Sequence, residues 1–78
     1  MNDRTQAVRT AIRGFSRRDA VALVKSFDLS PLEETCIIGQ DIMGKSAVEL
    51  SMEQNISVET VKRRRCDALK RMANELNI

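Results

Sequence analysis

The chain of 78 residues contains no histidine, tryptophan or tyrosine, and it has only two phenylalanines, three glycines and one proline. The absence of histidine removes the commonest general base and the commonest zinc ligand. The two cysteines, Cys36 and Cys66, are far apart and form no Cys-x-x-Cys pair. We therefore expect no metal, no cofactor and two reduced thiols.

Long apolar segments are also absent. No apolar run approaches the roughly 20 residues that a membrane-spanning helix needs, and residues 1–4 contain no apolar core of a secretion signal. We therefore expect a cytoplasmic protein that makes no membrane contact. With so few aromatic residues, the core must consist of aliphatic and methionine side chains, which close helix packing or association of two copies would stabilise.

An enzyme is not expected, because the sequence offers neither a nucleophile paired with a base nor a glycine-rich phosphate loop. Gly44-Lys45-Ser46 resembles the end of a phosphate-binding P-loop. However, the glycine required upstream is missing, and the preceding residues are predicted to form a helix and not a strand. We interpret the tripeptide as a helix terminator followed by a cap.

Charge is unevenly distributed along the chain, although the net charge is only +2. Residues 1–27 carry six basic residues against two acidic ones, a net charge of +4. Residues 28–59 carry one basic residue against seven acidic ones, a net charge of −6. Residues 60–78 carry six basic residues against two acidic ones, again +4. Positive charge is thus concentrated in the two end segments.

Helix signals dominate, because apolar residues recur at intervals of three and four and β-branched alternation is missing. The pattern predicts an all-α fold of about five helices in a single domain, residues 1–78. The helices are expected over roughly residues 3–13, 17–27, 31–42, 47–54 and 58–78. Their boundary signals are Gly14, Ser16, Ser30 with Pro31, Gly44, Ser46 with Glu49, and Ser57.

The last two predicted helices are separated by a turn at residues 55–57, which is the layout of a helix-turn-helix. We expect Leu50 and Val61 to pack the two helices together and Ile56 to fill the inside of the turn. The first turns of the longer helix would then project four side chains outward, where they could reach base edges in a major groove. These residues are Val58, Glu59, Lys62 and Arg63.

A basic run, Lys62-Arg63-Arg64-Arg65, is followed by Lys70 and Arg71. Such a run suits phosphate neutralisation, which releases condensed counterions from DNA. A charge run by itself is more often a solvated helix face whose arginine stems cover the edges of the core. The turn pattern ahead of the run favours the nucleic-acid interpretation.

Three short patterns extend through this region: Ser46-x-x-Glu49-Leu50-Ser51, then Ile56-Ser57-x-x-Thr60-Val61-Lys62, then Ala68-Leu69-x-Arg71-Met72. Upstream lies Leu29-Ser30-Pro31-x-Glu33. Together they resemble region 4 of bacterial sigma-70-type factors and, equally, the DNA-binding domain of LuxR-type regulators. The resemblance covers about residues 29–73 and its motif is moderately specific. Residues 1–28 resemble no family that we can name.

The resemblance implies roles for individual residues. Glu59 lies where sigma factors use a glutamate to accept a hydrogen bond from a cytosine amino group, Arg63 lies at a second base-contacting position, and Lys62 lies where both families touch DNA. Val58 departs from the sigma pattern, which commonly has arginine there. Arg64 also departs, because sigma factors have an aliphatic residue at that position.

Phosphate contacts are predicted from the basic run, the caps and the resemblance, which places Ser46 and Thr60 beside phosphates. The predicted residues are Lys45, Ser46, Ser57, Thr60, Arg64, Arg65 and Lys70.

The expected function is sequence-specific binding of double-stranded DNA in transcriptional regulation, with residues 29–78 as the DNA-binding region. Because one helix-turn-helix reads few base pairs, we expect a homodimer on two half-sites. Residues 1–28 would either complete the core or mediate dimerisation, and their arginines could add phosphate contacts. The alternative is a sigma-like interaction module that docks on RNA polymerase or another regulator through the acidic middle segment.

Overall fold

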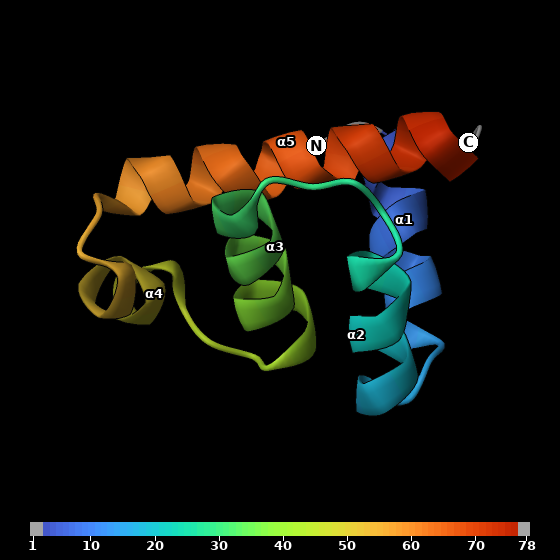
Figure 1. Cartoon of the computed structure of the whole chain (residues 1–78), viewed down its shortest axis with the longest axis horizontal. Coiled ribbons are helices and arrows are strands. Elements are labelled where there is room, and N and C mark those ends of the chain that lie inside the picture. Colours follow the sequence, from blue (N-terminus) through green and yellow to red (C-terminus); the bar gives the residue numbers. More distant parts are fainter. Residues whose placement is uncertain (1–2, 77–78) are drawn as a thin grey trace.

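The computed structural model describes the backbone of residues 3–76 and the side chains of residues 6–76 (Figure 1). The order of elements is α1 (Asp3–Arg13), α2 (Arg17–Lys25), α3 (Pro31–Ile37), a π-helical turn η1 (Ile38–Ile42), α4 (Ala47–Gln54) and α5 (Val58–Leu76). The described residues contain five α-helices and no strand, which confirms the predicted all-α fold. The third predicted helix is α3 continued by η1, which wraps more loosely than an α-helix.

α5 forms one long side of the molecule, and the other helices lie against it (Figure 1). α1, α3 and α4 all contact α5, whereas η1 contacts α1 and α2. In Figure 1 α4 is seen end-on beneath the N-terminal part of α5, so the axes of these two helices cross steeply.

The helix boundaries follow from local capping. The Ser30 hydroxyl accepts a hydrogen bond from the Glu33 N–H at 3.3 Å, and the Glu33 carboxylate accepts one from the Ser30 N–H at 2.9 Å. This reciprocal pair fixes the start of α3. Ser16 caps α2 by accepting a hydrogen bond from the Asp19 N–H at 3.2 Å.

The larger apolar cluster joins the N-terminal helices to α3 and α5. Arranged by sequence, its buried members are Val8, Ile12, Ala20, Val24, Ile37, Ala68, Leu69, Met72 and Ala73. Side chains of α1 and α2 therefore complete the core around α5, as one of the two predicted roles of residues 1–28 requires. The buried side of α5 ends at Ala73, because Leu76 is 41% exposed.

Glu33 is a buried carboxylate, only 4% exposed. Burial by itself would raise the pKa of Glu33, but hydrogen bonds with the Ser30 backbone and side chain and the positive charges of Arg71 and Arg64 lower it overall. The Arg71 Nε lies 3.6 Å from the Glu33 carboxylate. The ionised Glu33 carboxylate thus links the start of α3 to Arg71 of α5.

We predict that Glu33→Gln destabilises the protein near neutral pH and that this loss shrinks in acid. Because the folded-state pKa of Glu33 lies below the ordinary 4.5, its ionised form stabilises the fold above that value. The contribution disappears as the pH falls through the lowered pKa. Urea unfolding of both proteins at about pH 7 and about pH 3 measures the difference. An equal loss of stability at both pH values would contradict this prediction.

Candidate nucleic-acid interface

α4 and α5 are joined by a tight turn of residues 55–57. Asn55 has a left-handed backbone, with φ 55° and ψ 46°, a conformation that asparagine tolerates better than most residues. The Ile56 N–H donates to the Ser51 carbonyl at 3.0 Å, and the Ser57 hydroxyl accepts from the Thr60 N–H at 3.0 Å. Each end of the turn is therefore fixed by a hydrogen bond to a flanking helix.

A second apolar cluster holds α4 against α5. Cys36 of α3, Leu50 of α4 and Val61 of α5 are buried together, and Ile56 packs against them from the turn. This confirms the contacts expected of Leu50, Val61 and Ile56. Burial raises the pKa of the Cys36 thiol, the effect of nearby Arg64 being smaller and opposite, so Cys36 acts here as a small apolar side chain.

The four predicted base-reading residues lie on one side of the first turns of α5. At 100° per residue they fall within about 140° of the helix circumference. Glu59, Lys62 and Arg63 are exposed, and Val58 is partly buried. Lys70 is exposed on the same side about two turns further along. This strip, which we call the α5 outer strip, consists of Val58, Glu59, Lys62, Arg63 and Lys70.

The cations of the α5 outer strip are not neutralised inside the molecule. Lys62, Arg63 and Lys70 have no hydrogen bond or ion pair to any other residue that the structure describes. The strip is consequently a surface of positive charge with one carboxylate, that of Glu59. A surface of this kind attracts a polyanion.

Arg65 must be removed from the predicted phosphate contacts. Its Nε and Nη2 atoms donate to the Asp41 carboxylate at 2.6 and 2.8 Å, and this hydrogen bonding raises the pKa of Arg65. The Arg9 Nε lies 3.5 Å from the same carboxylate. The Arg65 and Asp41 side chains are 15% and 7% exposed. The guanidinium therefore links α5 to η1 and is not presented to solvent.

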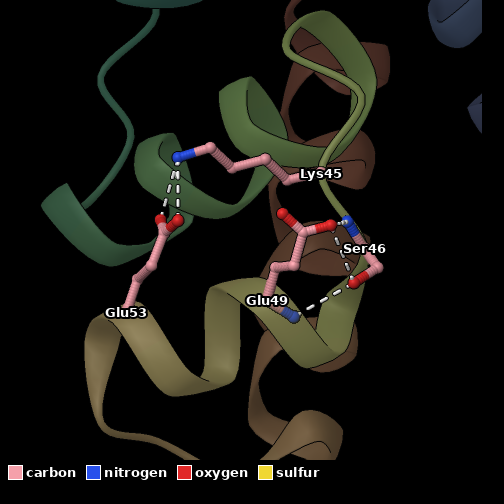
Figure 2. Close-up of polar contacts among 4 residues, drawn as sticks. All are labelled: Lys45, Ser46, Glu49 and Glu53. Carbon is pink, nitrogen blue, oxygen red and sulfur yellow. Dashed lines mark hydrogen bonds and ion pairs between the residues drawn. The ribbon is translucent and has the colours of Figure 1, made fainter.

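The start of α4 is also occupied by internal contacts (Figure 2). The Lys45 Nζ donates to both oxygens of Glu53, at 2.9 and 3.1 Å. The Ser46 hydroxyl accepts from the Glu49 N–H at 3.0 Å, and the Glu49 carboxylate lies beside the Ser46 N–H at 3.4 Å. Two carboxylates therefore offset the attraction of Lys45 and of this helix terminus for phosphate.

The remaining predicted phosphate residues stay accessible to different degrees. Ser57 and Thr60 hold their hydroxyls 2.8 Å apart at the start of α5. The Arg64 guanidinium lies 3.7 Å from Asp67 and is 43% exposed, so this surface ion pair is weak. The residues that remain candidates for contacts with DNA phosphates are thus Ser57, Thr60, Arg64 and Lys70.

Sequence reasoning missed the Asp41 cluster, because its partners are far apart along the chain and no short motif brings them together. Comparisons of the chain with protein families, with curated proteins and with solved structures found no match. Among the described residues, no group of three or more histidine, cysteine, aspartate or glutamate side chains could hold a metal ion. No helix in that part of the chain is long and apolar enough to cross a membrane.

Arg63 and Arg65, which are two residues apart, should differ in their effect on stability. Arg65→Ala leaves the buried Asp41 carboxylate without its closest partner and should lower the free energy of unfolding by about 3 kcal/mol. Arg63→Ala removes an exposed, unpaired side chain and should change it by less than about 0.5 kcal/mol. Urea unfolding monitored by circular dichroism measures both values. If Arg65→Ala lowered the free energy of unfolding as little as Arg63→Ala does, the contact with Asp41 would contribute nothing to the fold.

Proposed function

We propose that the chain binds double-stranded DNA, with α4 and α5 acting as a helix-turn-helix and α5 entering the major groove. The observation that supports this most directly is the α5 outer strip, whose three cations are exposed and unpaired on a helix held at a fixed angle. A major groove about 12 Å wide admits one α-helix. Lys62 and Arg63 then reach guanine O6 and N7, and Glu59 accepts from a cytosine amino group.

The position of Lys70 suggests a separate role in the same complex. It lies seven residues after Arg63, about 10 Å along the helix axis. A helix whose first turns lie in the groove brings its later turns toward the phosphate backbone. Lys70 therefore contributes counterion release, which is independent of sequence, whereas Lys62 and Arg63 contribute base discrimination. Regulation of transcription and binding as a homodimer are parts of the proposal.

We first predict that selection from a random pool of duplex DNA enriches one motif, and that substitutions then separate the two kinds of contact. On the selected duplex, Lys62→Ala with Arg63→Ala should lower the affinity at least tenfold, about 1.4 kcal/mol, and relax the base preference. Lys70→Ala should weaken all sequences similarly and reduce the salt slope by about one. Fluorescence anisotropy at several salt concentrations measures both effects.

Lys25→Ala is the control for this experiment, because Lys25 is an exposed lysine of α2 outside the α5 outer strip. It should leave the affinity for the selected duplex nearly unchanged. A symmetric motif would indicate two copies per site. Failure to enrich any motif, or unchanged low-salt binding by the Lys62 and Arg63 double variant, would overturn the proposal.

A further inference from the structure

The turn between α1 and α2 forms a corner that the proposed DNA contact does not use. Arg13 ends α1, Phe15 lies in the turn, and Arg17 begins α2. These three residues, which we call the α1–α2 corner, border a shallow groove of about 190 Å³. The other residues lining the groove are Ile12, Ala20, Asp41 and Ile42. Phe15 is 48% exposed, so an aromatic ring remains accessible at the edge of the groove.

The charge of this groove is positive. Arg13 and Arg17 are exposed and have no hydrogen bond or ion pair to any other residue in the described part of the chain. Asp41 is the acidic lining residue, but Arg65 binds its carboxylate and its side chain is 7% exposed. The corner therefore combines two guanidinium groups that lack a partner among the described residues with the half-exposed ring of Phe15 and the partly exposed Ile42, while Ile12 and Ala20 behind them are only 2% exposed.

The α1–α2 corner lies away from the outer side of α5. In Figure 1 the turn is the light-blue connection at the end of α1 that is remote from α5. Most of the α5 outer strip lies on the N-terminal half of α5, which packs against α3 and α4, whereas α1 and α2 share an apolar cluster with the C-terminal half. A duplex bound to the α5 outer strip would leave the corner accessible. The corner can thus bind a ligand of its own.

We propose that the α1–α2 corner binds an acidic segment of a partner protein that carries a bulky apolar side chain. Its carboxylates accept charge-assisted hydrogen bonds from Arg13 and Arg17, and its apolar side chain fills the groove against Phe15. Arginine and aromatic side chains of this kind are enriched at protein interfaces. The phosphate backbone of a nucleic acid fits less well, because phosphates gain nothing from contact with the Phe15 ring or the partly exposed Ile42.

A second copy of the chain is also a poorer occupant. The exposed apolar residues of α4, Val48 and Met52, lie beside Glu49 and Glu53. Glu49 caps its own helix and Glu53 is paired with Lys45 at 2.9 Å, so the negative charge of that face is already engaged. Charge complementarity therefore favours a separate acidic partner.

The first experiment pans a random-peptide display library on the full chain. Peptides in which aspartate or glutamate flanks a bulky apolar residue should be enriched. The dominant peptide is then synthesised with a fluorescent label and titrated with the protein. Arg13→Glu with Arg17→Glu should weaken its binding at least tenfold, about 1.4 kcal/mol. Phe15→Ala, which changes no charge, should weaken it severalfold.

The matched control is Arg18→Glu with Lys25→Glu. It makes the same change in net charge on exposed α2 residues that do not line the groove. Because neither side chain lines the groove and salt screens exposed charges, this control should change peptide affinity by no more than about threefold. All variants should retain the circular dichroism spectrum of the parent protein, since the substituted side chains are exposed or half exposed.

Failure to enrich acidic peptides would overturn the proposal. So would an equal loss of peptide affinity in the two double charge variants, or a loss of peptide binding when Lys62 and Arg63 are substituted. Self-association that disappears in the Arg13 and Arg17 variant would identify a second copy as the occupant instead. The Arg13 and Arg17 variant should bind the selected duplex no worse than the control does. Peptide binding and DNA binding can therefore fail independently.

Discussion

The arrangement of the molecule depends on one constraint: α5 buries the same side of the helix along most of its length. Val61 belongs to the small cluster with α3 and α4, while Ala68, Leu69 and Met72 belong to the large cluster with the N-terminal helices. Because one straight helix contributes to both clusters, the orientation of its exposed side is determined by apolar packing. The polar residues on that side have no part in deciding which way they face.

This constraint divides the basic run between different tasks. Four consecutive residues of an α-helix point in directions 100° apart, so Lys62 and Arg63 face solvent while Arg65 faces η1. The Asp41 carboxylate then makes Arg65 an internal contact between elements distant in sequence. Counting positive charges in the run therefore overestimates what is available to a polyanion, and helix geometry identifies the cations that remain.

Local features of the sequence predicted most of the fold. Capping signals depend on residues three apart, which is why α4 begins where Ser46 and Glu49 indicated. The Leu50 and Val61 contact was predictable from helical spacing and a short turn. The burial of Glu33 and the pairing of Asp41 with Arg65 were not, because both depend on how distant helices pack. The exposure of Lys62 and Arg63 could accordingly be predicted from the sequence, whereas the internal pairing of Arg65 could not.

The uneven distribution of charge along the chain determines which charged residues are paired in the folded molecule and which remain exposed. Several acidic residues of the middle segment are engaged where they lie: Glu33 and Glu49 in capping, Asp41 with Arg65, and Glu53 with Lys45. Asp41 and Glu33 thereby pair with some cations of the end segments, Arg65 and Arg71 among them. Other cations of the end segments have no partner among the described residues: Lys62, Arg63 and Lys70 of α5, and Arg13 and Arg17 of the N-terminal helices. Since α1 and α2 pack beneath α5, those cations emerge at two separate places, the α5 outer strip and the α1–α2 corner (Figure 1). A nearly neutral chain of this size thereby presents two positive surfaces, one mostly polar, the other bordering a groove and carrying the half-exposed ring of Phe15. That difference in apolar character is the physical reason for assigning them ligands of different chemistry.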